Sequence, residues 1–298
     1  VAMQNPKSPQ VLRLATVEDG NIVLCEEGMS ALADCSEAVH IVGVVGPAGD
    51  GKSTLCSILS SELCSQPFST RFPARDTVLE AVTHGAWISV VKAEQGTVVI
   101  LDIEGVDMGQ SLAETKFALL AAITSTMLVY NVRGPRLRQS ALEGLQLYNL
   151  ARKQAAGISS AEREMCVLLR DTTAEALAEA RAALPRVASE RSEAKEALSV
   201  VEEGKLHALP VPSTTVASQF GSNEELFRQV RILLETLVPR SPSDRTGTST
   251  ATTLRSLLPL INANVISVHA MAASNAELEA ELDMMMHEQE YSDDDDNI

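Results

Sequence analysis

A glycine-rich segment between two apolar runs is the part of the chain best suited to chemistry. Residues 46–53 read Gly-Pro-Ala-Gly-Asp-Gly-Lys-Ser, directly after the apolar run 40–45 and before the apolar start of a helix at 54–59. A loop between a strand and a helix can turn its N–H groups toward a phosphate chain, and the helix adds its positive end. Lys52 would reach the β- and γ-phosphates, and the Ser53 hydroxyl would ligate Mg²⁺. The apolar runs on both sides favour a nucleoside triphosphate site over an ordinary turn. The predicted binding residues are Gly46, Gly49, Asp50, Gly51, Lys52, Ser53 and Thr54.

A second motif follows about fifty residues later, where an apolar run ends in Asp102-Ile103-Glu104-Gly105. A carboxylate at a strand end can hold Mg²⁺ through water, and the N–H of Gly105 can sense the γ-phosphate. Thr83, in Thr83-His84-Gly85-Ala86-Trp87, is a candidate second Mg²⁺ ligand, although a simple strand-start hydroxyl is an equal alternative. For Trp87, packing in the core is favoured over ligand contact.

The pair Arg170-Asp171 ends a third apolar run and is the candidate for base selection. An aspartate there can accept both N1–H and N2–H of guanine, which adenine does not offer, and Arg170 can stack on the ring or fix the aspartate. The guanine-reading tetrapeptide N-K-x-D of Ras-like proteins does not occur in the sequence. A surface ion pair is the alternative interpretation of Arg170 and Asp171.

Strands that alternate with helices predict an α/β fold of the P-loop NTPase kind, with a mostly parallel sheet and helices on both faces. The expected strands are 11–16 and 21–25 as a hairpin, then 40–45, 86–92, 96–103, 126–132, 165–169 and 206–216. The expected helices follow the glycine loop and cover 112–123, 137–156, two parts of 173–203 broken at Pro185, 224–237, the apolar face from Leu254 to Val265, and 273–288. Residues 240–250 are expected to form a loop. We predict one domain over 1–270, followed by a helix and acidic tail over 271–298.

The amino-acid composition limits the classes of partner that the protein is expected to bind. A net charge of −16 argues against broad nucleic-acid binding, which needs a basic face. The sequence holds no apolar run of about eighteen residues, so no transmembrane segment is expected. Five cysteines without a C-x-x-C pair are typical of reduced thiols, so we expect a cytoplasmic protein in which Cys56 and Cys166 are core residues.

The motifs together resemble the large GTPase domain of the guanylate-binding protein and atlastin group, within the dynamin superfamily. The order and spacing agree over about 12–268, and a T-x-G-x-W piece combined with an Arg-Asp base reader is specific to that group. On this resemblance we expect the family's helical middle region to be missing from this sequence or cut after its first helix. The matching pieces are 46–53, 83–87, 101–105, Ser125-Thr126-Met127-Leu128-Val129-Tyr130-Asn131, and 170–171.

This resemblance implies roles for the matching residues. Lys52, Thr83 and Glu104 would serve catalysis, while Ser53, Thr83 and Asp102 would hold the metal. The implied ligands are GTP and GDP, with Mg²⁺ as cofactor. The implied partner is a second copy of the domain in a nucleotide-dependent homodimer, and peripheral membrane association stays open.

Two departures from the family pattern put hydrolysis in question. The family usually carries an arginine where this chain has Gly49, and an arginine finger contributes about 10³–10⁵ in rate. It also tends to carry a serine where this chain has Ala81, two residues before Thr83. An arginine in this chain or in a partner subunit is a candidate substitute, namely Arg71, Arg75, Arg133 or Arg136.

Three hypotheses therefore remain open on the sequence alone. The first is a slow dynamin-like GTPase, and the second is a GTP-binding switch or scaffold with little hydrolysis. The third is a P-loop kinase or ATPase, which the Arg-Asp pair and a stretch between Ser65 and Arg75 with only two arginines disfavour.

Overall fold

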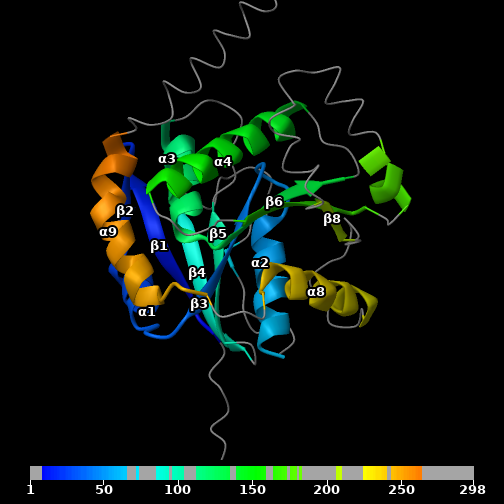
Figure 1. Ribbon diagram of the computed structural model, residues 1–298, viewed down its shortest axis with the longest axis horizontal. Helices are drawn as coiled ribbons and strands as arrows, with labels where there is room; N and C mark the ends of the chain where they lie inside the picture. Colours follow the sequence, from blue (N-terminus) through cyan, green and yellow to red (C-terminus); the bar gives the residue numbers. More distant parts are fainter. Residues whose placement is uncertain are drawn as a thin grey trace, which may run out of the picture.

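A single eight-stranded sheet forms the centre of the domain, with the strand order β2-β1-β4-β5-β3-β6-β7-β8 (Figure 1). The computed structural model describes residues 9–65, 72–73, 85–93, 96–103, 112–134, 139–158, 164–172, 175–179, 181–182, 206–209, 224–239 and 243–263. The strands are β1 (Val11–Glu18), β2 (Asn21–Leu24), β3 (Val39–Val45), β4 (Ala86–Ala93), β5 (Gly96–Ile103), β6 (Met127–Arg133), β7 (Glu164–Arg170) and β8 (Leu206–Leu209).

The sheet has a parallel half and an antiparallel half. β5, β3, β6, β7 and β8 run parallel to one another, whereas β2, β1, β4 and β5 pair antiparallel. Short connections explain the antiparallel half, because a crossover between parallel strands needs a dozen or more residues. Asp19 and Gly20 both have positive φ, as a two-residue hairpin turn requires. Ala93 pairs with Gly96, which likewise leaves no room for a crossover. The α/β prediction is confirmed, and its parallel part is confined to one half.

Helices cover both faces of the sheet, as predicted (Figure 1). α1, α3, α4 and α9 share a buried apolar cluster with one face, and α2 and α8 share a second cluster with the other. The helix bounds are α1 (Glu26–Ala33), α2 (Lys52–Leu63), α3 (Leu112–Thr124), α4 (Gln139–Ile158), α8 (Glu224–Leu237) and α9 (Gly247–Ala263).

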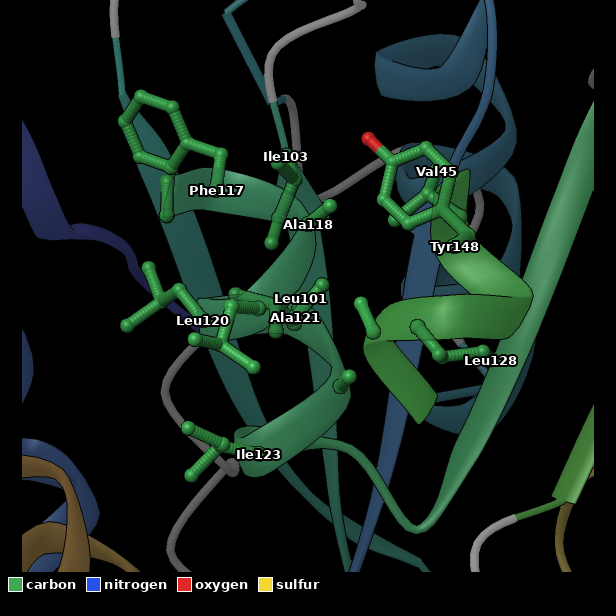
Figure 2. Close-up of a cluster of buried hydrophobic side chains, with 14 of the residues drawn as sticks. Val45, Leu101, Ile103, Phe117, Ala118, Leu120, Ala121, Ile123, Leu128 and Tyr148 are labelled. Atoms are coloured by element: carbon green, nitrogen blue, oxygen red, sulfur yellow. The ribbon is translucent and has the colours of Figure 1, made fainter. Parts of the chain in front are cut away.

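Alternation along each central strand divides its side chains between the two clusters. Figure 2 shows Leu101 and Ile103 of β5 among α3 side chains, with Tyr148 of α4 in the same cluster. The intervening residues of β5 belong to the cluster under α2. Because successive strand residues point to opposite faces, Asp102 lies on the α2 face. The same alternation along β7 puts Arg170 on that face.

Two helices differ from the sequence prediction. α1 was not expected, because its eight residues carry only a few buried apolar positions, among them Met29 and Leu32. α9 begins at Gly247, inside the loop predicted for 240–250. A reciprocal pair of side-chain caps explains this start: Ser249 N–H donates to Thr246 Oγ1 at 3.0 Å, and Thr246 N–H donates to Ser249 Oγ at 3.1 Å.

Several predicted elements lie wholly or partly outside the described residues. The helix 273–288 and the acidic tail are outside, as is 210–216 of the predicted last strand. Of the region 173–203, the structure describes only 175–179 and 181–182, which are helical. Within the described part of the chain, none of the helices has the length and apolarity needed to cross a membrane.

Candidate functional site

The loop between β3 and α2 has a backbone that needs glycine. Gly46, Gly49 and Gly51 have φ values of +138°, +77° and +72°. Other residues rarely adopt these values, and a Cβ on Gly46 would also lie 2.2 Å from the carbonyl oxygen of Asn131. α2 begins at Lys52, directly after Gly51. The predicted strand–loop–helix arrangement is therefore present, with the N-terminal end of α2 at the loop.

Lys52 points back over this loop. Its Nζ donates a hydrogen bond to the carbonyl oxygen of Pro47 at 2.8 Å, and only 6% of the residue is exposed. The ammonium group is thus held against the loop backbone, at the positive end of α2. Ser53 and Thr54 occupy the next two positions of the same helix. A cation at a helix N-terminus is suited to an anionic ligand such as a phosphate chain.

Asp102 is the buried carboxylate next to this loop. It ends β5, which pairs with β3 through Val44, and only 2% of it is exposed. Burial raises the pKa of the Asp102 carboxyl to about 6, and the nearby Ser53 hydroxyl and Lys52 ammonium oppose that rise. Ser53 nevertheless makes no hydrogen bond of normal geometry to Asp102, since neither carboxylate oxygen has a partner among the described residues. A buried carboxylate in this state lacks the compensation that proteins usually supply.

Mg²⁺ fits this arrangement chemically, because it prefers oxygen ligands and usually keeps waters and substrate phosphates in its shell. Ser53 and Asp102 provide a hydroxyl and a carboxylate on adjacent elements. The described residues contain no group of three or more His, Cys, Asp or Glu side chains able to hold a metal. A metal at this site would need oxygen ligands in addition to these two side chains.

Trp87 lies beside Asp102 in the sheet, because the two residues pair across β4 and β5. Its ring packs against the cluster under α2, which agrees with the predicted packing role. The Arg13 guanidinium lies 4.5 Å from the ring centroid. Trp87 is the only tryptophan of the chain, so its fluorescence can report on changes at Asp102.

The end of β6 supports the glycine loop through Asp50. Asn131 Nδ2 donates to the Asp50 carbonyl oxygen at 2.9 Å, and the Arg133 backbone N–H donates to Asp50 Oδ2 at 3.0 Å. Asn131 is fully buried. Sequence reasoning did not assign this supporting role to Asn131. The sequence feature that could have indicated this role is a buried amide side chain in a strand whose other buried residues are apolar, apart from the Tyr130 hydroxyl.

The end of β7 holds the predicted base-reading pair. Asp171 has a φ of +56° and receives a hydrogen bond from Arg133 Nε at 3.2 Å on its Oδ2 atom. Its buried Oδ1 atom has no partner in the part of the chain that the structure describes. Arg170 is only 8% exposed and lies against the loop, since a Cβ on Gly51 would be 2.7 Å from its guanidinium. Burial lowers the pKa of Arg170, while Asp171 and Asp50 oppose that shift.

The structure therefore brings together, at the ends of β5, β3 and β7, the predicted residues Gly46, Gly49, Asp50, Gly51, Lys52, Ser53, Thr54, Asp102, Arg170 and Asp171. The remaining predicted site residues, Thr83, Glu104 and Gly105, lie outside the described residues. The same holds for Ala81 and for three of the four candidate arginines, Arg71, Arg75 and Arg136.

A glycine loop from a central strand into a helix, beside a carboxylate on the adjacent parallel strand, defines the site of a P-loop NTPase. The model of the guanylate-binding protein family, N-terminal domain, matches residues 19–173, more than half of the chain. This chain belongs to that family. The match begins in the turn between β1 and β2 and ends just after Asp171, so it includes the whole loop and the predicted base-reading pair.

Similar proteins occur among ciliates and trichomonads. The chain is 33% identical over 110 residues to Protein SEY1 homolog 2 and 34% identical over 110 residues to Protein SEY1 homolog 1, both from Paramecium tetraurelia. It is 29% identical over 108 residues to Protein SEY1 homolog 2 of Trichomonas vaginalis. Each match covers 35% of this chain and 13% of the relative, so the resemblance concerns a small part of these longer proteins.

Proposed function

We propose that this domain binds GTP and GDP together with Mg²⁺ and hydrolyses GTP slowly. One observation carries the proposal: the buried, unpartnered carboxylate of Asp102 lies beside the Lys52 ammonium and the Ser53 hydroxyl at the start of α2. A polar group in this state is costly to the fold unless a ligand satisfies it. Mg²⁺ and a phosphate chain together would satisfy both the carboxylate and the ammonium.

Guanine as the base is supported by Asp171 and by the name of the family. The free Oδ1 atom and the remaining lone pairs of Oδ2 can accept two N–H groups from one base edge. Guanine presents N1–H and N2–H side by side, whereas adenine presents an acceptor at N1. The family's name, guanylate-binding protein, agrees with this chemistry.

Slow turnover is supported by the absence of a cation at the centre of the loop. Gly49 provides no side chain, and nothing lies within 4 Å of where its Cβ would be. Bound Mg²⁺ would supply charge neutralisation of the phosphates. Lys52 would then be the only loop residue with a positive side chain to take up charge on the transferring phosphoryl group.

A second candidate is a GTP-binding switch or scaffold with almost no hydrolysis. The same Gly49 position favours it, since binding residues are present while the family's arginine is absent. The two candidates differ only in rate. We expect micromolar affinity and a turnover far below the usual enzyme range of about 1–10³ s⁻¹.

The test is a titration of the chain with non-hydrolysable GTP and ATP analogues and with GDP, each with and without Mg²⁺, followed through Trp87 fluorescence. Phosphate release from GTP is then measured on the same sample. We expect a preference for guanine nucleotides, a Mg²⁺-dependent signal for the GTP analogue, and slow release. Equal affinity for the ATP and GTP analogues would refute the guanine assignment, and no binding of either would refute the nucleotide site.

A further inference from the structure

Arg133 and Gly134, at the end of β6, lie between the glycine loop and the base-reading pair. The Arg133 backbone N–H donates to Asp50 Oδ2 at 3.0 Å, and the Gly134 N–H donates to the Arg170 carbonyl oxygen at 2.9 Å. β6 itself pairs with β3 on one side and β7 on the other. The backbone from which the Arg133 side chain starts is therefore held from both sides.

The Arg133 side chain reaches Asp171. Its Nε donates to Asp171 Oδ2 at 3.2 Å, and the Arg133 side chain is 48% exposed while that of Asp171 is 16% exposed. Asp171 also has the left-handed backbone conformation, with a φ of +56°. This conformation is uncommon for a residue with a side chain. One oxygen is held by Arg133, and the buried Oδ1 lacks a partner among the residues described.

We propose that Arg133 is a positioning residue that sets guanine selectivity by holding the Asp171 carboxylate in the orientation that accepts two N–H groups. This inference rests on the proposed nucleotide function and names a determinant of its base specificity. Two N–H donors of guanine must meet two acceptor positions at once, so rotation of the carboxylate weakens the second contact first. A single N–H donor tolerates that rotation better. Arg133 therefore matters most for the guanine 2-amino group.

Inosine triphosphate is the matched probe, because inosine differs from guanosine only in lacking the 2-amino group. In the unmodified protein we expect GTP to bind about tenfold more tightly than inosine triphosphate, since a hydrogen bond to a charged group is lost. In Arg133→Gln the GTP to inosine triphosphate ratio should fall by about threefold, because a half-exposed ion pair contributes modestly. Arg255→Gln is the control, since Arg255 forms a similar exposed pair with Glu26 between α9 and α1. It should leave the ratio unchanged.

The affinity ratio distinguishes a positioning role of Arg133 from a purely structural role. A loosened loop would weaken the binding of both nucleotides equally and leave the ratio unchanged. An unchanged ratio in Arg133→Gln with GTP binding present would overturn the proposal for Arg133. Failure of the unmodified protein to bind GTP would instead overturn the proposed function. Thermal unfolding verifies that each variant is folded. If Arg133→Gln does not fold, Arg133→Lys keeps the charge, removes the Nε–H that Asp171 accepts, and must lower the same ratio.

Discussion

Buried polar side chains differ in their hydrogen bonding between two places in the sheet, the edge strand β2 and the strand ends around the glycine loop. At β2, in the antiparallel half, Lys116 is 3% exposed and donates to the Gly20 carbonyl oxygen at 2.7 Å and to Asn21 Oδ1 at 3.0 Å. Asn262 of α9 accepts from Ile22 N–H at 2.7 Å and donates to its carbonyl oxygen at 2.9 Å. In the parallel half, the strand ends around the glycine loop hold polar atoms that lack partners in the described structure: both oxygens of Asp102, Asn131 Oδ1, Arg170 Nε and Asp171 Oδ1.

The difference separates polar groups that serve the fold from polar groups available to a ligand. A satisfied buried lysine contributes to stability, and its loss leaves the carbonyl and amide oxygens it contacted without a donor. An unsatisfied buried carboxylate lowers stability and is tolerated when something else depends on it. The candidate site therefore combines the glycine-loop motif with several buried polar atoms whose hydrogen bonding is incomplete.

The two buried lysines provide the largest test of this comparison. Lys52→Ala should reduce affinity for the GTP analogue by about a thousandfold, because the loop loses the charge that faces the phosphates. Its melting temperature should stay near that of the unmodified protein. Lys116→Ala should show the reverse, with a loss of stability of about 2–4 kcal/mol and unchanged affinity in the folded fraction.

Calorimetric titration and thermal unfolding of both variants make this measurement. Lys92→Ala is the control for the removal of a lysine as such, because the Lys92 side chain is 85% exposed. Full affinity in Lys52→Ala would remove the basis for a phosphate site at the loop.

The loop and its helix could be predicted from sequence because their signals are local. Gly46 to Ser53 follow one another in the chain, and the alternation of β5 and β7 places Asp102 and Arg170 on the α2 face. The proposed base-reading role of Arg170 and Asp171 was inferred from a charged pair at the end of a buried run. All of these depend on short spacing and strand period.

The supporting contacts could not be predicted, since they depend on the strand order. Asp50 meets Asn131 and Arg133 only because β6 lies beside β3, and the hydrogen bonds join residues more than 80 positions apart. The start of α9 was missed for a different reason. Its Ser/Thr-rich first turn resembles a loop in composition, while Thr246 and Ser249 cap the helix reciprocally.

Substitution of Asp171 provides the second test, and its expected effect on nucleotide affinity is smaller than that of Lys52→Ala. Asp171→Ala should weaken GTP binding by about a hundredfold, because two N–H donors of the base lose a charged acceptor. Asp171→Asn should be nearly as harmful to GTP. Asp171→Asn should however gain affinity for xanthosine triphosphate, because the 2-carbonyl of xanthine can accept a hydrogen bond from the asparagine amide.

Competition titrations with GTP, ATP and xanthosine triphosphate measure these affinities. Asp244→Asn is the control, since Asp244 is an exposed aspartate before α9. Retention of the GTP preference in Asp171→Ala would assign base selection to another residue.

Asp102→Asn tests the unsatisfied carboxylate directly. Burial raises the pKa of this group to about 6, so the folded protein binds the proton more tightly than the unfolded chain, and ionisation at pH 7 costs stability. The neutral amide should therefore stabilise the nucleotide-free protein by about 1–3 kcal/mol. The same change should remove the Mg²⁺ dependence of GTP-analogue binding. Denaturant unfolding at pH 7 and titrations with and without Mg²⁺ measure the two effects, and a loss of stability would show that the carboxylate serves the fold.

Substitution of Gly49 has the smallest expected effect, and substitutions at the three loop glycines rank the positions by backbone strain. Gly49 has open space around its Cβ position. Gly49→Ala and Gly49→Arg should therefore each lower the free energy of unfolding by about 1 kcal/mol, because of the left-handed φ alone. Gly51→Ala should lose more stability, because its Cβ would clash with the buried Arg170 guanidinium. Gly46→Ala should lose the most stability, because its Cβ would clash with backbone atoms. Gly49→Arg would add the cation that the family carries at this position, but the φ of Gly49 is +77°, which residues with a side chain rarely adopt. We therefore expect phosphate release by Gly49→Arg to stay as slow as in Gly49→Ala, because the strained backbone displaces the new guanidinium along with the loop. Faster release by Gly49→Arg alone would show that the missing cation, and not the loop backbone, limits the rate.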